Sequence, residues 1–214
     1  GELVDVEVDI TRSQLPATTV VGLPDTAVQE SRERVRSAIR NSGLSWPNGS
    51  KVTISLAPAD LRKEGPAYDL PIATGILLAS GQVVADVEDA VFIGELGLTG
   101  EDRPVRGLLP MVMRAAARGM KRAFVPEQNA PEAALVDALP ISPVTSLASL
   151  ASHLLGAVPI DAYHREPSAG QPEPPANVTN VTDFADIVGQ EHVKRALDVA
   201  AAGGHNLVLK GPPG

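Results

Sequence analysis

The first apolar pattern in the chain is a strict alternation over residues 4–10. Every second residue there is Val or Ile, and Asp5, Glu7 and Asp9 stand between them. This period of two predicts a half-exposed strand. Thr18 to Leu23 is a second short apolar run, which we expect to be the hairpin partner of the first. Val52, Ile54 and Leu56 repeat the alternation and predict a third strand.

Helical spacing begins after Pro24-Asp25 and extends to about Asn41, with Val28, Val35 and Ile39 on the inner face and Gly43 as the stop. Further elements are predicted as helix 69–79, strand 90–94, an edge ribbon around 96–100, helix 107–118, strand 123–126, helix 131–138, strand 141–144 and helix 147–155. Helices and strands therefore alternate along the chain. The predicted fold class is a mixed α/β or α+β sandwich with one sheet.

Residues 157–183 interrupt this pattern. The segment carries Pro159, Pro167, Pro172, Pro174 and Pro175 among Ser, Gly, Asn, Thr and Glu, with almost no apolar period. Such a composition predicts an extended linker, because it cannot bury enough surface to offset the entropy of ordering. We expect a first domain at 1–156 and the opening of a second at 184–214.

The amino-acid composition excludes several classes of binding and catalytic site. The 26 acidic residues exceed the 18 basic ones, and the net charge of −8 argues against a surface that attracts nucleic acid everywhere. Cysteine is absent, so this chain has no thiolate metal site or cysteine nucleophile. No apolar run reaches the length of a membrane span, and we expect a cytoplasmic protein with no membrane partner. Because residue 1 is Gly, the natural N-terminus is expected to lie upstream.

The second module ends on a glycine loop. Asp186-Ile187-Val188-Gly189-Gln190 precedes an amphipathic helix that carries Val193, Ala196, Leu197 and Ala200 and ends at Gly203-Gly204. Asn206 to Lys210 predicts a short buried strand, and Gly211-Pro212-Pro213-Gly214 follows at once. A strand before a Gly-rich turn is the context of the Walker A phosphate loop. The alternative is an ordinary helix–strand hairpin with a Pro-Gly turn.

The ordered series resembles the entry to an AAA+ ATPase module. In that resemblance Ile187, Val188, Gly189 and Gln190 line the adenine pocket, and Gly211, Pro212, Pro213 and Gly214 open the phosphate loop. The loop's Lys and Ser or Thr would follow Gly214. We therefore expect residues 1–214 alone to need no cofactor and to show neither tight ATP binding nor hydrolysis.

Three segments of the first domain carry a second resemblance: Lys63 to Pro71, Ile93 to Gly100 and Arg103 to Leu108. Their order and spacing resemble the proteolytic domain of Lon, a fold also found in a small-subunit ribosomal protein and in the recombination protein RadA. The similarity to the ComM/YifB family of magnesium chelatase-like AAA+ ATPases is closer. It includes Val21-Gly22-Leu23-Pro24-Asp25 and covers essentially the whole chain.

The peptidase dyad implied by the Lon resemblance is missing. Lon-type peptidases use a Ser nucleophile after a Gly-Pro pair and a Lys base after a Gly-Leu pair. Here Ala67 follows Gly65-Pro66, and Leu109 follows Gly107-Leu108. No residue is therefore assigned as catalytic, and we expect no peptidase activity. Ser80 and Lys63 remain as a hydroxyl and an amine, and both are expected at the surface.

Basic residues suggest a DNA contact. Arg103, Arg106, Arg114 and Arg118 are the candidates, with Lys121 and Arg122 nearby, and a second group comprises Arg32, Arg34, Arg36 and Arg40. The alternative is that these are solvated faces paired with Glu30, Glu33, Glu101 and Asp102. Trp46 and Tyr68 stand alone and are expected in the core or at its rim. Asp86, Glu88 and Asp89 are expected only to solvate a turn, so no metal site is predicted.

For the whole protein, the resemblance implies a ring-forming, hexameric AAA+ ATPase that uses ATP and Mg²⁺ to drive DNA branch migration in recombination. The first domain would then serve assembly, DNA contact or partner docking. One alternative is a chelatase-type or chaperone-like motor that acts on a protein partner. Another is that residues 1–156 form only a structural oligomerisation collar.

Overall fold

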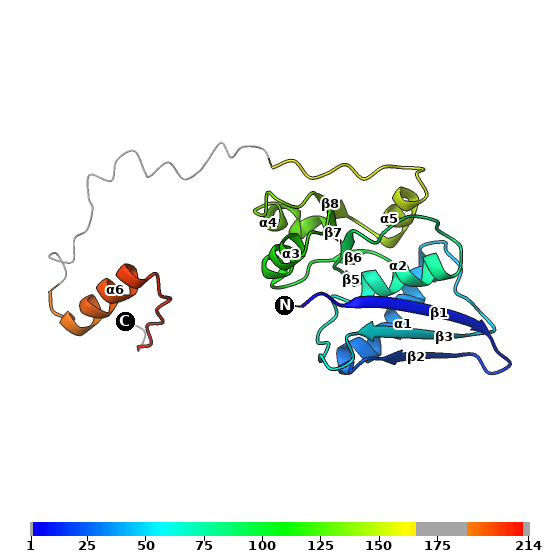
Figure 1. The fold of residues 1–214 in the computed structure, drawn as a ribbon, viewed down its shortest axis with the longest axis horizontal. Coiled ribbons are helices and arrows are strands. Elements are labelled where there is room, and N and C mark those ends of the chain that lie inside the picture. The colour runs from blue at the N-terminus through cyan, green and yellow to red at the C-terminus, as the bar shows by residue number, and fades with distance from the viewer. Residues whose placement is uncertain (1, 166–187, 212–214) are drawn as a thin grey trace. The chain divides into compact units, whose positions relative to one another are not determined.

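The computed structural model describes residues 2–165 and 188–211 of the chain (Figure 1). The chain divides into two compact units, Gly1–Glu166 and Pro167–Gly214. The predicted linker lies largely outside the described residues, and so do Ile187, Pro212, Pro213 and Gly214 of the predicted nucleotide site.

The first sheet contains β1 (Asp5–Arg12), β2 (Ala17–Val21) and β3 (Ser50–Ala57) in the order β1-β3-β2. β3 pairs antiparallel with β1, placing Val8 opposite Ile54, and parallel with β2, placing Val20 opposite Ile54. The predicted hairpin between the first two strands is therefore wrong. β3 inserts between them because its Val52, Ile54 and Leu56 are all buried, as a central strand requires.

A second sheet is fully parallel, so the prediction of one sheet is also wrong. It comprises β4 (Ala90–Phe92), β7 (Arg122–Pro126) and β8 (Ile141–Val144) in the order β4-β7-β8. A separate antiparallel ribbon joins β5 (Glu95–Leu96) to β6 (Asp102–Arg103), as the turn around residues 96–100 predicts. The predicted mixed α/β class is confirmed. The elements divide between two small sheets because the short strand β4 ends at Phe92 and the chain then turns into the ribbon.

Helices fill the intervals between the strands. They are α1 (Thr26–Asn41), α2 (Asp69–Ala79), α3 (Leu108–Ala117), the 3₁₀ turn η1 (Glu127–Asn129), α4 (Ala130–Ala133), α5 (Leu147–Leu154) and α6 (Glu191–Gly203). Asp25 caps α1 by accepting a hydrogen bond from the Val28 amide at 2.8 Å. Helix α4 is shorter than the predicted 131–138. After Ala133 the amides of Leu135, Val136 and Leu139 donate to carbonyls three residues earlier, so the segment continues as tight turns and not as an α-helix.

Helix α2 is the centre of the first unit. Its side chains are buried nearly all round, and it contacts β1, α1, β4, β5 and α5. Figure 1 shows it between β1 and the β5–β6 ribbon. Gly75 permits the close approach to the sheet, because a Cβ there would lie 2.7 Å from Val8 Cγ2. This packing places the start of α2, and the loop before it, next to both sheets.

The second unit is described through α6 and the residues that flank it. Gly189 and Gln190 both have positive φ before the helix, and Gly204 ends it in the left-handed conformation. Asn206 to Lys210 is not a strand, which corrects the sequence prediction, and Val208 is 91 % exposed. A strand needs a neighbour to pair with, and none is found for this segment within residues 188–211. No helix in the described parts of the chain is long and apolar enough to span a membrane.

Candidate functional site

The loop before α2 holds the first of the two positions matched to the peptidase dyad. Gly65 donates its amide to Asp25 Oδ2 at 3.1 Å, and the Ala67 carbonyl accepts from Gly94 N at 3.1 Å. The Ala67 side chain is half-buried and packs against the cluster that contains Ile93 and Leu108. A methyl group at this point carries no nucleophile.

Leu109, the second dyad position, is in the first turn of α3. Its amide donates to Glu132 Oε1 at 3.3 Å, and its side chain is half-buried. The isobutyl group cannot accept a proton. Neither position therefore supplies the hydroxyl or the amine that a Ser–Lys peptidase needs.

Lys63 was predicted at the surface, and that expectation is wrong. Its side chain is fully buried, and its Nζ donates to the Pro58 carbonyl. Main-chain hydrogen bonds join Lys63 N to Leu23 O at 3.1 Å and Asp25 N to Lys63 O at 3.0 Å. These two hydrogen bonds hold the 58–65 loop against the start of α1. The Lys63 amine is therefore buried by contacts between segments that are far apart in the sequence. Ser80 is half-buried at the end of α2, where its hydroxyl donates to Leu77 O at 3.2 Å.

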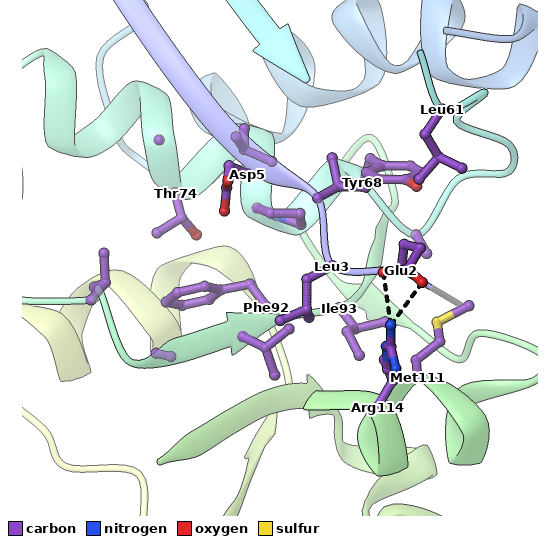
Figure 2. A pocket seen from close by; sticks show the side chains of 18 of the residues that line it. Glu2, Leu3, Asp5, Leu61, Tyr68, Thr74, Phe92, Ile93, Met111 and Arg114 are labelled. Carbon is purple, nitrogen blue, oxygen red and sulfur yellow. Dashed lines mark hydrogen bonds and ion pairs between the residues drawn. The ribbon is translucent and has the colours of Figure 1, made fainter. Parts of the chain in front are cut away.

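A groove of about 560 Å³ opens beside Ala67. Apolar side chains from four parts of the fold line it, among them Leu3, Tyr68, Phe92, Ile93 and Met111. Figure 2 shows the Glu2–Leu3 segment running along this groove, with Leu3 near Phe92 and Ile93. A cleft therefore lies beside the position that the resemblance matches to a nucleophile, and this position carries no nucleophilic group.

Glu2 anchors that segment to α3. Its carboxylate accepts from Arg114 Nη2 at 2.7 and 2.9 Å and from Arg118 Nη2 at 3.2 Å. The hydrogen bond from Arg114 is the main reason that the pKa of Glu2 is lowered. Two of the four predicted DNA-contact arginines are thus paired with a carboxylate, and Glu2 was not a partner that the sequence suggested.

The other two predicted contacts differ from each other. Arg103 pairs with Glu101 at 2.7 Å, a partner that the solvated-face alternative named. The pKa of Glu101 is lowered to about 2, first by the Thr99 hydroxyl and also by Arg103. Arg106 is exposed and forms no salt bridge with the residues that the structure describes. Whether these arginines touch DNA stays a prediction.

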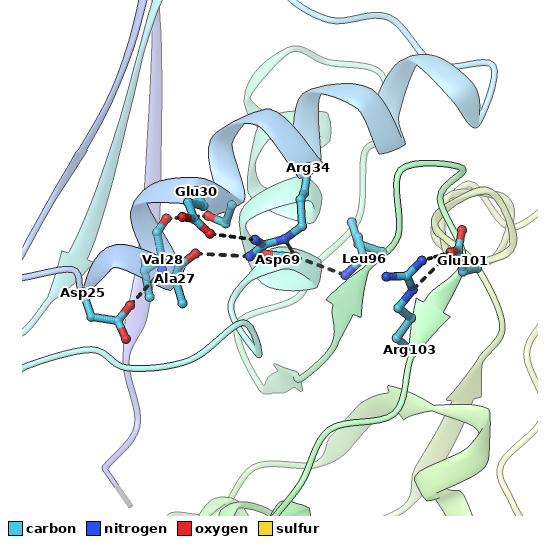
Figure 3. Close-up of polar contacts among 10 residues, drawn as sticks. Asp25, Ala27, Val28, Glu30, Arg34, Asp69, Leu96, Glu101 and Arg103 are labelled. Atoms are coloured by element: carbon cyan, nitrogen blue, oxygen red, sulfur yellow. Dashed lines mark hydrogen bonds and ion pairs between the residues drawn. The ribbon is translucent and has the colours of Figure 1, made fainter.

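A buried aspartate, Asp69, lies where α1, α2 and the ribbon meet (Figure 3). Arg34 donates twice to Asp69, from Nε at 2.8 Å and from Nη2 at 3.1 Å, and Leu96 N donates to Asp69 Oδ2 at 3.2 Å. Burial raises the pKa of Asp69 to about 6 against the opposing effect of Arg34. The lone acid that opens an otherwise apolar helix was the sequence signal for this contact.

Asp102 was expected as a solvated partner of arginine, and this is wrong. It is 7 % exposed, and neither carboxyl oxygen has a hydrogen-bond partner among the described residues. Burial, with the nearby charge of Asp69, raises the pKa of Asp102 to about 9. The ribbon turns Asp102 inward over Gly94, where a Cβ would lie 2.2 Å from Oδ1. No group of three or more acidic or histidine side chains within the described residues is placed to hold a metal ion.

Val188, Gly189, Gln190 and Gly211 are the described members of the predicted nucleotide site. Three of them form the turn before α6, and Gly211 follows the 206–210 segment. All four are exposed. A Cβ at Gly189 or Gly211 would meet nothing within 4 Å, so the backbone there is open to a ligand. Whether these residues hold a nucleotide through main-chain groups stays a prediction.

Comparison with known proteins follows the same division of the chain. The family described as subunit ChlI of Mg-chelatase matches residues 6–129, and a second description, magnesium chelatase subunit ChlI, matches residues 183–214. The first match covers more than half of the chain, which therefore belongs to the magnesium chelatase-like family that contains the AAA+ module. Within it, the chain belongs with ComM and YifB, which are similar over nearly its whole length.

Three relatives illustrate this similarity. The chain is 44% identical to an uncharacterised protein of Mycobacterium tuberculosis over all of its length. It is 41% identical to the competence protein ComM of Haemophilus influenzae and 42% identical to the uncharacterised protein YifB of Escherichia coli, each over 99% of the chain. The chain spans about two fifths of the length of these relatives. Lon protease of Geobacter metallireducens is 25% identical over 83% of the chain, spanning 22% of that enzyme.

Proposed function

We propose that this chain is the N-terminal part of an AAA+ ATPase that remodels DNA as a hexameric ring. The residues at 188–190 and around 211 would contact the nucleotide, and ATP with Mg²⁺ would supply the free energy through phosphoryl transfer. The first unit would perform no chemistry and would act as an assembly or docking module.

One observation carries the docking role. A groove lies beside Ala67, and both positions matched to the dyad hold apolar side chains. Glu2 and Leu3 line this groove together with apolar and aromatic side chains, and the Glu2 carboxylate accepts from Arg114 there. The same contacts would suit an extended peptide that carries a carboxylate. Such a surface binds a segment of protein and does not cleave it.

The DNA role is supported by the ComM/YifB similarity and by arginines outside the apolar core. The test is ATP hydrolysis by the whole protein with and without DNA. Stimulation by single-stranded or branched DNA of several-fold or more is expected. A rate that no DNA changes would contradict the proposal.

A second function has its own support. The net charge of −8 and the pairing of Arg114 and Arg118 with Glu2 favour a motor that acts on a protein partner. In that case hydrolysis would respond to a folded or unfolded protein substrate and not to DNA. Measuring ATP hydrolysis of the same preparation with DNA and with the protein substrate separates the two functions.

A further inference from the structure

A second cavity lies at the free edge of the first sheet, away from the groove beside Ala67. It measures about 340 Å³ and opens between the start of β2, helix α1 and the loop from Trp46 to Ser50. Arg32 and Arg36 of α1 line it together with Trp46 and Asn48. Glu33 also lines the cavity, and it forms no salt bridge among the described residues.

Arg36 is held in place without an anion. Its guanidinium carbon lies 5.8 Å from the centre of the Trp46 ring, which is itself 8 % exposed. The Nε of Arg36 is buried and has no hydrogen-bond partner in the described parts of the chain. A buried donor left unpaired is costly, so an acceptor that reaches it gains a strong charge-assisted hydrogen bond.

Arg32 and Arg40 flank Arg36 on the same face of α1. Arg32 donates to main-chain oxygens only, to Gln29 O at 3.0 Å and Thr18 O at 3.2 Å. Arg40 donates to Asn48 Oδ1 at 3.1 Å. The spacing of four residues aligns the three guanidinium groups along the helix, with a rise of about 6 Å between neighbours.

This stripe differs from four other arginines of the first unit. Arg34, Arg103, Arg114 and Arg118 each face a carboxylate. Within the described residues, Arg32, Arg36 and Arg40 have no carboxylate partner. Three positive charges in a row, one with an unpaired buried donor, form an anion site that none of the described residues fills.

We propose that this cavity binds phosphate groups of a nucleic-acid backbone, with Arg36 and Arg32 as the central contacts and Arg40 at the rim. The anion site follows from the geometry, and the choice of nucleic acid as the occupant rests on the proposed DNA function. The spacing along α1 suits neighbouring phosphates of one strand. Because the Trp46 ring is buried under Arg36, bases cannot stack on it, and binding should be independent of base sequence.

The test compares variants of the whole protein in binding labelled single-stranded and branched DNA over a range of salt concentrations. Arg32→Gln with Arg36→Gln should weaken binding and lower the slope of log affinity against log salt by about 1.4 to 1.8, the value for two lost phosphate contacts. Arg62→Gln with Arg165→Gln removes the same charge from two exposed positions outside the basic groups named above and should leave the slope unchanged. Arg36→Lys keeps the charge and should retain most of the slope, and equal urea unfolding of the double variant and the parent excludes misfolding as the cause.

Inorganic phosphate provides the second arm. Inorganic phosphate should compete with DNA for binding to the parent protein. It should no longer compete for binding to the double variant. If phosphate affinity falls while the DNA slope is unchanged, the nucleic-acid occupant is refuted in favour of a free phosphate or nucleotide. If neither changes, there is no anion site. Hydrolysis is not the readout, so DNA binding here without DNA-stimulated ATP hydrolysis would refute the motor and leave the site standing.

Discussion

At the scale of single residues, Asp102 shows what a buried carboxyl group without a partner does to stability. With its pKa raised to about 9 in the folded chain and near 3.9 in the unfolded chain, the folded state binds the extra proton between these values. Stability must therefore fall as pH rises through this window. Asp69, with a pKa of about 6, acts in the same direction over the lower part of it.

The variant Asp102→Asn tests this directly. The amide has the same shape and cannot ionise, so the variant should lose a pH-dependent contribution whose slope approaches about 1.4 kcal/mol per pH unit. We expect the variant to gain stability over the parent as pH rises from about 5 to 8. Urea unfolding of both chains across that range measures the difference. Parallel pH profiles would contradict the burial of an ionisable Asp102.

Glu2 offers a residue-level test of the predicted arginine contacts. Glu2→Gln would release Arg114 and Arg118. If these arginines contact DNA, the slope of log DNA affinity against log salt should be steeper by about 1 to 2 for Glu2→Gln than for the parent. Adding Arg114→Ala and Arg118→Ala to this variant should remove the gain. Glu7→Gln is the control, because it removes the same charge from an exposed position of β1. Equal slopes for Glu2→Gln and Glu7→Gln would leave the arginines as a solvated face.

At the scale of elements, the close packing of α2 against β1 organises the first unit. Gly75→Ala would place a methyl group 2.7 Å from Val8 Cγ2. Despite the better helix propensity of Ala, we expect a loss of about 1–3 kcal/mol from overpacking. Val8→Ala should relieve it, so the double variant should cost less than the sum of the two single changes. Strict additivity in urea unfolding would show that this contact does not set the packing.

The same scale shows where sequence reasoning succeeds. Alternation located the strands, and the cap at Asp25 with the stop at Gly43 located α1, because these signals are local. The choice of pairing strand is not a local property. The alternating pattern of β1 is compatible with pairing to either β2 or β3, so the predicted hairpin of the first two strands is wrong. Lys63 and Asp102 were placed in solvent because their burial depends on Pro58 and Gly94, contacts that no short window contains. That Ala67 carries no hydroxyl and Leu109 no amine follows from the residue identities alone, whereas their match to a peptidase dyad stays a prediction.

At the scale of the whole molecule, the first unit combines the groove beside Ala67, apolar side chains at both positions matched to the dyad, and an arginine stripe on α1. The proposed account assigns the groove to protein segments and the stripe to DNA, with the AAA+ module as the source of movement. The two surfaces lie on different elements of one unit, so each can be altered separately. A docking module of this kind needs no catalytic group of its own.

The most direct measurement is the movement of a branched DNA junction by the whole protein. The account predicts that the junction migrates with ATP and Mg²⁺, and stays in place when ATP is replaced by a non-hydrolysable analogue. Migration should also weaken as salt rises, because phosphate contacts release counterions. Junctions that remain unmoved while the same preparation hydrolyses ATP in response to a protein substrate would contradict the DNA function and favour the protein-remodelling motor.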